Sequence, residues 1–322
     1  MSETLLQTIN LTKSFASRRG FFGGNKIENI AVDRVSLSLQ KSETLGLVGE
    51  SGCGKSTLGL TIMRLYTPDD GRIFFDGREI TNLDERQLKS IRKQMQMVFQ
   101  DPFAALDSRL TIEQILTEPL EIHNIGTRSE RRKTAADLLE RVGLSAEDLR
   151  RFPSEFSGGQ QQRIGIARAL ALKPKLLICD EPVSSLDVSV QAQILNLLRD
   201  LQDEFGLSYL FISHNIAITA FMSSRIGVMY LGRLVEIGVS KQITTAPHHP
   251  YTQALLSAIP EPDPARREIE IGVKGETDEI TERPTGCVFR LRCPLAQEIC
   301  AAEEPQLRVI EENQEVACHF VG

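Results

Sequence analysis

The sequence predicts an α/β fold, with a mostly parallel sheet covered by helices on both faces. Two observations lead to this prediction. Apolar strand-like segments alternate with segments of helical periodicity over most of the chain, and a glycine-rich stretch directly follows one of the strands. Alternation of this kind produces parallel strands joined by helices. Ligands of such folds bind at the carboxyl ends of the strands, so we expect the site there.

The elements are expected in the following order. Segments 5–15 and 31–39 alternate apolar and polar residues, which predicts half-buried antiparallel strands, and the basic, glycine-containing segment 16–29 is expected to be an exposed loop. Further strands are predicted at 44–48, 72–75, 96–99, 176–179, 207–212, 226–230 and 233–237, and helices at 57–65, 84–93, 158–172, 189–205 and 215–222. In segment 101–156 the pattern predicts helices, most clearly at 111–116 and 129–142, and it interrupts the alternation.

These elements divide the chain into three predicted domains. Residues 1–100 and 157–240 form the α/β core together with the antiparallel β subdomain. Residues 101–156 form an inserted helical subdomain, and 241–322 form a small C-terminal extension that contains cysteines.

The glycine-rich stretch is Gly49-Glu50-Ser51-Gly52-Cys53-Gly54-Lys55-Ser56-Thr57, a full match to the phosphate-loop pattern G-x-x-x-x-G-K-[ST]. It lies between a predicted strand and a predicted helix, as the pattern requires, so the fold is predicted to be of the P-loop (RecA-like) type. Its glycines bring backbone N–H groups close to phosphate oxygens. Lys55 would reach the terminal phosphates, and the Ser56 hydroxyl would hold Mg²⁺. The alternative is a glycine-rich turn that binds nothing.

Three other groups of residues suit phosphate chemistry. Asp180 and Glu181 follow an apolar strand, where Asp180 would hold Mg²⁺ and Glu181 would orient the attacking water. His214 follows the next strand and could donate to a γ-phosphate. Ser157 precedes two glycines at a helix start, which forms a second anion-binding N-terminus. The alternatives are two solvated acids, a structural histidine and an ordinary capped helix.

Composition limits the classes of function. The chain has 322 residues, a net charge of −6 and no tryptophan, which argues against a general nucleic-acid binder. The basic run Arg131-Arg132-Lys133 is expected on the solvated side of a helix. There is no apolar run near the ~20 residues of a membrane span, and 1–15 lacks the features of a secretory signal. We therefore expect the chain in the cytosol or on the surface of the membrane.

The cysteines raise a separate question. Cys287, Cys293, Cys300 and Cys318 cluster near the end of the chain, with intervals of five, six and seventeen residues. A cytosolic chain makes disulfides unexpected, and the C-x-x-C pattern of structural zinc is missing from this segment. Four thiolates suit an iron–sulfur cluster, with zinc or unliganded thiols as the alternatives.

Taken together, the motifs resemble those of the nucleotide-binding subunit of an ABC transporter. Gly49 to Thr57 is similar to Walker A, Gln100 to the Q-loop residue, 156–160 to the signature motif, 176–181 to Walker B, 185–187 to the D-loop and His214 to the switch histidine. The resemblance implies that two subunits pack head to tail with ATP between them. Catalysis would involve Glu181, His214 and Gln100. Mg²⁺ would be held by Ser56, Gln100 and Asp180. The partner's ATP would be bound by Ser157, Gly158, Gly159 and Gln160, and Asp187 would serve in the D-loop.

Other stretches narrow the resemblance to the ATPase subunits of bacterial dipeptide and oligopeptide importers. These are 155–160, 179–184, 230–232 and the run His249-Pro250-Tyr251-Thr252-Gln253-Ala254-Leu255-Leu256. Phe156, before the signature serine, is similar to the importer's second, F-type ATPase. The tail resembles importer ATPases that carry a [4Fe–4S] cluster bound by the four cysteines. Nickel, glutathione and opine importers share much of the pattern, and a soluble ABC ATPase acting on ribosomes or DNA is the alternative from another class.

The resemblance also implies cofactors, partners and a location. ATP, Mg²⁺ and a [4Fe–4S] cluster are the implied cofactors. The implied partners are an unlike second ABC ATPase, two transmembrane permeases and an extracytoplasmic substrate-binding protein, at the cytoplasmic face of the inner membrane. Two positions need comment: Asn215 replaces the family's usual aspartate, and the aromatic that stacks on adenine is expected at Phe15, with Phe21 or Phe22 as rivals.

Overall fold

The fold is described from a computed structural model that covers residues 3–18, 26–258 and 283–321. The chain separates into two compact units, which we describe one at a time. The first unit consists mainly of Asn82–Ile212, together with Gln40–Glu43. The second contains Thr4–Leu39, Thr44–Thr81 and Ser213–Gly322. The phosphate loop therefore belongs to the second unit, and the predicted Walker B and signature residues belong to the first.

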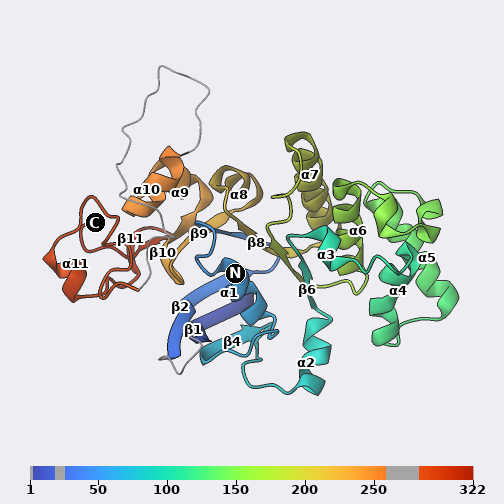
Figure 1. Cartoon of the computed structure of the whole chain (residues 1–322), viewed down its shortest axis with the longest axis horizontal. Coiled ribbons are helices and arrows are strands. Elements are labelled where there is room, and N and C mark those ends of the chain that lie inside the picture. Colours follow the sequence, from blue (N-terminus) through green and yellow to red (C-terminus); the bar gives the residue numbers. More distant parts are fainter. Residues whose placement is uncertain (1–2, 19–25, 259–282, 322) are drawn as a thin grey trace. The chain divides into compact units, whose positions relative to one another are not determined.

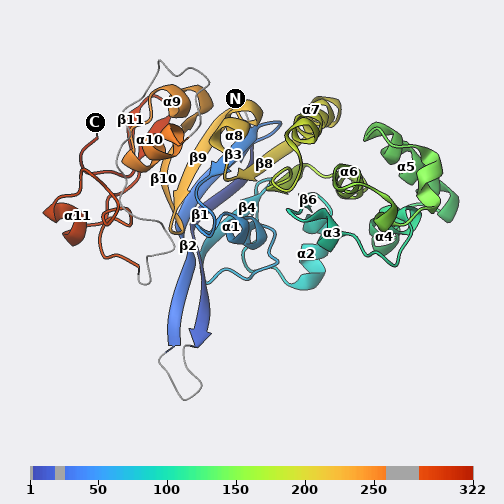
Figure 2. The same ribbon diagram turned by 45° about the horizontal axis from the view of Figure 1, so that its top comes forward.

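The second unit begins with an antiparallel sheet in the order β2-β1-β4-β5. Its strands are β1 (Thr4–Arg18), β2 (Lys26–Gln40), β4 (Asp70–Phe75) and β5 (Arg78–Glu79). Figure 2 shows β1 and β2 side by side as a long ribbon. Asp76 and Gly77 both have positive φ and join β4 to β5, as the predicted hairpin turn requires. The predicted antiparallel β subdomain is confirmed.

The same unit contains a second group of paired strands in the order β11-β12-β10-β9-β3. β3 (Thr44–Val48) pairs in parallel with β9 (Arg225–Tyr230), which pairs antiparallel with β10 (Arg233–Val239). β12 (Gln314–Val316) pairs with β10 on one side and with β11 (Arg308–Glu311) on the other, so β11 is the edge strand (Figure 1). The helices here are α1 (Lys55–Ile62), α8 (Ile216–Met222), α9 (Ser240–Thr245), α10 (Pro250–Ser257) and α11 (Glu298–Ala302).

The first unit contains a parallel arrangement in which β7 lies between β6 and β8. Its strands are β6 (Met95–Val98), β7 (Leu176–Asp180) and β8 (Ser208–Ser213). Its helices are α2 (Glu85–Arg92), α3 (Pro102–Ala105), α4 (Ile112–Ile122), α5 (Arg128–Arg141), α6 (Gly158–Leu170) and α7 (Val188–Phe205), with 3-10 turns at Ala146–Arg150 and Pro153–Glu155. β7 and β8 are buried at every position, so they form the core of this unit.

Local signals explain where these helices begin. Asp84, Thr111, Thr127 and Ser157 each accept a hydrogen bond from the backbone three residues later, in reciprocal capping boxes. Gly206, with φ of 63°, ends α7 in the left-handed conformation that glycine adopts without strain. The predicted P-loop α/β fold is confirmed, whereas the predicted domain boundaries stay a prediction.

One expectation needs correction, and several short elements were not predicted. The predicted loop at 16–29 is too long, because β1 continues to Arg18 and β2 already begins at Lys26. Paired long strands can extend past the apolar pattern because the ladder of backbone hydrogen bonds continues without it. The helices α9, α10 and α11 and the strands β11 and β12 were missed, because their short segments carry little periodicity.

Candidate functional site

The phosphate loop connects β3 to α1, and close packing fixes its path. Gly54 has φ of 103°, and a Cβ built there would lie 1.9 Å from the Ala31 carbonyl oxygen. A Cβ on Gly49 would lie 2.1 Å from the carbonyl oxygen of Met229. Neither position can hold a side chain without moving backbone. The loop is therefore held between β2 and β9, with its backbone at the start of α1.

Lys55 lies inside the loop and is 4% exposed. Its ammonium donates to the carbonyl oxygens of Gly49 (2.7 Å) and Glu50 (2.9 Å) and contacts the Cys53 sulfur at 3.6 Å. Burial, partly opposed by the charge of Lys55, raises the pKa of the Cys53 thiol. Cys53 is thus a neutral packing residue, and Lys55 is a fixed cation at a helix N-terminus, which suits a phosphate ligand.

Two residues outside the motif hold the second position of the loop. The Glu50 N–H donates to the Tyr251 hydroxyl oxygen (2.8 Å), and Arg292 donates to the Glu50 carboxylate (2.7 Å). Tyr251 lies in α10 and Arg292 in the cysteine-containing segment. Sequence reasoning missed both roles, because nothing in the spacing of residues about 200 positions apart indicates contact.

The first unit brings two of the predicted catalytic residues together. Gln100, just after β6, donates from Nε2 to the Glu181 carboxylate at 3.2 Å. Glu181 has φ of 45°, which is uncommon for a residue with a side chain, and its N–H donates to the Ile212 carbonyl on β8. Asp180 ends β7 and is 6% exposed. The carboxyl end of this strand thus presents one buried and one half-buried carboxylate, next to an amide.

The predicted signature residues lie at the start of α6. Ser157 and Gln160 form a capping box, in which Ser157 N–H donates to Gln160 Oε1 at 2.9 Å. Gly159 packs against α7, and a Cβ there would lie 2.5 Å from Val190 Cγ1. Asp187 is exposed at the start of α7. The helix start is therefore exposed, as an anion-binding N-terminus needs to be.

The switch histidine position, His214, is exposed just after β8. The next residue, Asn215, is the N-cap of α8, and its side-chain oxygen accepts from the N–H groups of Ala217 and Ile218. Asparagine and aspartate are about equally good N-caps. The replacement of the usual aspartate at this position therefore preserves the local structure.

The candidate adenine-stacking aromatic, Phe15, lies on β1 and is 37% exposed. Its ring centroid is 5.2 Å from that of Tyr66 in an edge-on arrangement, and the Lys13 ammonium is 5.5 Å from it. Its rivals Phe21 and Phe22 lie outside the described residues. Phe15 therefore remains a prediction.

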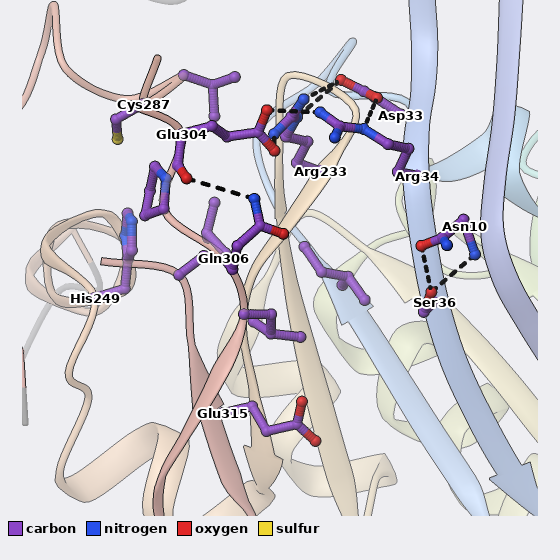
Figure 3. Close-up of a pocket in the computed structure, with 16 residues that line it drawn as sticks. Asn10, Asp33, Arg34, Ser36, Arg233, His249, Cys287, Glu304, Gln306 and Glu315 are labelled. Atoms are coloured by element: carbon purple, nitrogen blue, oxygen red, sulfur yellow. Dashed lines mark hydrogen bonds and ion pairs between the residues drawn. The ribbon is translucent and has the colours of Figure 1, made fainter. Parts of the chain in front are cut away.

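A cavity of about 440 Å³ lies among β1, β2, β10 and the C-terminal segment of the second unit. Figure 3 shows Arg34 and Arg233 in contact with Asp33 and Glu304 on one wall, and His249 and Cys287 on the other. These arginines are compensated by carboxylates. The cavity therefore does not have the surplus positive charge of a phosphate site.

The four clustered cysteines come together in the second unit. Cys287, Cys300 and Cys318 are buried, Cys293 is half-buried, and Cys287 N–H donates to the Cys300 carbonyl at 2.8 Å. Burial, with further contributions from the other three thiols, raises the pKa of Cys287 to about 11. The donor set thus fits a cluster chemically. In the described ranges, however, no three His, Cys, Asp or Glu side chains are arranged to hold a metal ion.

Comparison with known proteins decides the family. Residues 32–184 match the ABC transporter family, and 235–300 match the oligopeptide/dipeptide transporter C-terminal region. The chain is 51% identical over 322 residues to the oligopeptide transport ATP-binding protein AppF of Bacillus subtilis, covering 99% of this chain and 98% of the relative. The chain belongs to the oligopeptide ABC transporter ATP-binding proteins.

Solved structures agree with this membership. The ATP-binding cassette MJ0796, a dimer in a post-hydrolysis state bound to ADP and Pi, is 30% identical with a TM-score of 0.65, covering 73% of this chain and 99% of that chain. The protein cbiO1 of Clostridium perfringens, part of the ABC transporter complex cbiONQ, is 27% identical with a TM-score of 0.65, covering 76% and 92%. As an ABC ATPase the chain hydrolyses ATP. Within the described residues, no helix is long and apolar enough to cross a membrane.

Proposed function

We propose that this ABC ATPase powers an importer of di- and oligopeptides by binding and hydrolysing ATP at a dimer interface. The observation that carries the proposal is the complete phosphate loop with the Lys55 ammonium fixed inside it. It occurs in a chain that matches a named oligopeptide transport ATP-binding protein over its whole length. The C-terminal match to the oligopeptide/dipeptide transporter region supports peptides as cargo.

Each predicted site residue has a role in this proposal. The ATP-binding residues are Phe15 on the adenine and, on the phosphates, Gly49, Glu50, Ser51, Gly52, Cys53, Gly54, Lys55, Ser56 and Thr57. Ser56, Gln100 and Asp180 would hold Mg²⁺, which would neutralise charge on the phosphates. Glu181 polarises the attacking water and His214 donates to the γ-phosphate. Ser157, Gly158, Gly159, Gln160 and Asp187 act on the partner's nucleotide.

The proposed assembly contains more than this chain. It comprises an unlike second ATPase, two permeases in the membrane and an extracytoplasmic substrate-binding protein, with this chain peripheral on the cytoplasmic face. ATP contacted by both ATPases closes their dimer, and hydrolysis removes that contact and lets it reopen. The transporter match in 235–300 supports permease partners.

A pair of substitutions tests the catalytic assignment. Glu181→Gln removes the carboxylate that polarises water, so we expect ATP hydrolysis to fall at least about a hundredfold while ATP binding persists. Lys55→Ala removes the fixed cation, so nucleotide binding itself is expected to weaken. Turnover is measured by phosphate release, and binding by fluorescence of N-methylanthraniloyl-ATP.

Glu204→Gln is the matched control, because Glu204 is an exposed carboxylate of the same unit that pairs with Arg141. It should hydrolyse ATP at the unmodified rate. Equal turnover in Glu181→Gln and the unmodified protein would refute the role of Glu181. Unchanged binding in Lys55→Ala would refute the phosphate loop as the ATP site.

We further propose that Cys287, Cys293, Cys300 and Cys318 hold a [4Fe–4S] cluster. The other three thiols act electrostatically on Cys287, so the four sulfurs lie near one another, and four cysteines are a suitable ligand set for such a cluster. The cluster would have a structural or regulatory role, because ATP hydrolysis contains no redox step. Iron and acid-labile sulfide analysis tests it.

A further inference from the structure

The C-terminal extension places two side chains on the phosphate loop. Tyr251 holds the Glu50 backbone N–H through its hydroxyl oxygen, and Arg292 holds the Glu50 carboxylate. Tyr251 is 1% exposed and Arg292 is 9% exposed. We propose that Tyr251 and Arg292 are positioning residues that set the ATP affinity of the phosphate loop by fixing Glu50 and neutralising its charge.

The two side chains are held in place by one aromatic core. The Tyr251 ring centroid lies 4.7 Å from that of Tyr230 and 5.4 Å from that of Phe289. The same buried cluster includes Val48, the residue immediately before the loop. The extension and the strand that leads into the loop therefore share a core. Because Tyr251 is already restricted by packing, its hydrogen bond to Glu50 costs little additional ordering.

Tyr251 and Arg292 together form a clamp on Glu50, and Glu50 connects this clamp directly to Lys55. Its N–H is held by Tyr251, while its carbonyl oxygen accepts from Lys55 (2.9 Å) and from the Cys53 N–H (3.3 Å). A rotation of the peptide that carries the Glu50 N–H would alter the start of the loop. Loss of the Tyr251 hydroxyl is therefore expected to loosen the backbone that positions Lys55.

Charge gives Arg292 a separate effect. The Glu50 carboxylate belongs to a loop that must accept a polyanion, and an unpaired carboxylate there would repel phosphate. An arginine guanidinium stays protonated in proteins, and Arg292 donates to the Glu50 carboxylate at 2.7 Å. Arg292 thus stays charged. Its guanidinium balances the negative charge of the Glu50 carboxylate. The Glu50 side chain is only 27% exposed, so solvent screens the interaction only partly.

The contact between Tyr251 and Glu50 also gives a role to the first three residues of the run His249 to Leu256, to which the catalytic cycle assigns none. His249 Nδ1 accepts from the Tyr251 N–H (3.0 Å) and caps α10, and Pro250 occupies its first position. The His248 and His249 N–H groups donate to Glu236 on β10. These contacts fix the start of α10, so that Tyr251 reaches the loop.

This inference rests on the proposed ATP site, and the full-length chain tests both separately. Arg292→Met should raise the dissociation constant of N-methylanthraniloyl-ATP and the KM for ATP about tenfold, with little change in kcat. Glu50→Gln added to Arg292→Met should restore the affinity, because no carboxylate is left to neutralise. Arg292→Lys retains the charge and should stay within about threefold of the unmodified protein. Tyr251→Phe should weaken binding about fivefold.

Two matched controls separate positioning from general stability. Tyr209→Phe removes another buried tyrosine hydroxyl, which donates to the Leu198 carbonyl in the first unit. Arg283→Met breaks another ion pair of the extension, with Asp33. Both should leave the KM for ATP unchanged, even where they lower the unfolding temperature.

The outcomes are distinguishable. If Lys55→Ala abolishes nucleotide binding while Arg292→Met and Tyr251→Phe leave it unchanged, the positioning role is refuted and the ATP site stands. If Arg292→Met weakens binding but Glu50→Gln does not restore it, the charge argument is refuted. Should Arg292→Met not fold, Tyr251→Phe remains as the test, and an altered melting temperature with an unchanged KM in that variant would refute the inference.

Discussion

Acidification is expected to destabilise the second unit through His249. This side chain is 2% exposed, and burial lowers its pKa from 6.5 to about 3. Its Nδ1 accepts from the Tyr251 N–H, so the neutral ring is the form that the fold uses. In the unfolded chain His249 takes up a proton below about pH 6.5, whereas in the folded chain it stays neutral to about pH 3.

The sign and size of the effect follow from this difference. The unfolded state binds more protons between about pH 6.5 and pH 3, so stability falls as pH falls through this window. At pH 5 the difference spans about 1.5 pKa units, which corresponds to about 2 kcal/mol of unfolding free energy. His249→Asn retains a side-chain oxygen that can cap α10 but does not titrate. It should therefore lack this part of the pH dependence.

Urea unfolding at pH 7.5 and pH 5 measures the effect. The chain has no tryptophan, so far-UV circular dichroism is the suitable signal. The unmodified protein should lose about 2 kcal/mol more than His249→Asn between the two pH values. The carboxylate of Glu236 and the thiol of Cys287, which lie near this region, are present in both proteins and cancel in the comparison. His123→Asn, at a half-buried histidine, should have a smaller effect. Equal losses in the unmodified protein and His249→Asn would refute the reasoning.

Two other predictions concern the loop and the cysteines. Gly54→Ala should destabilise the chain by about 3 kcal/mol or more, measured by urea unfolding, because both its φ and the Ala31 carbonyl oppose a Cβ. At Gly77 a Cβ would touch nothing, so Gly77→Ala has only the unfavourable positive φ and should lower the free energy of unfolding by about 1 kcal/mol. Equal losses of stability in Gly54→Ala and Gly77→Ala would contradict the packing argument. Anaerobically purified protein should contain about four iron and four sulfide per chain, and Cys293→Ser should lower both. Zinc at about one per chain without sulfide would rule out the cluster.

Local sequence patterns were sufficient to predict many of the helices and strands. The strand at 44–48 has the predicted bounds, and the predicted helix at 189–205 differs from α7 by one residue. These elements could be predicted because periodicity, caps and glycines act on neighbouring residues. The phosphate loop could be predicted for the same reason, because the residues that would bind the phosphates are nine consecutive positions of the chain. The ends of β1 and β2 were set instead by strand pairing.

The sequence by itself determined the α/β fold class, the phosphate loop, the carboxylates after β7 and the family resemblance. Only the tertiary structure decided that Tyr251 and Arg292 meet Glu50, and that the cysteine-containing segment shares a core with the strand before the loop. The physical reason is the distance along the sequence over which each interaction acts. A motif fixes the backbone of its own residues, whereas contacts between residues more than 200 positions apart depend on how complete elements pack.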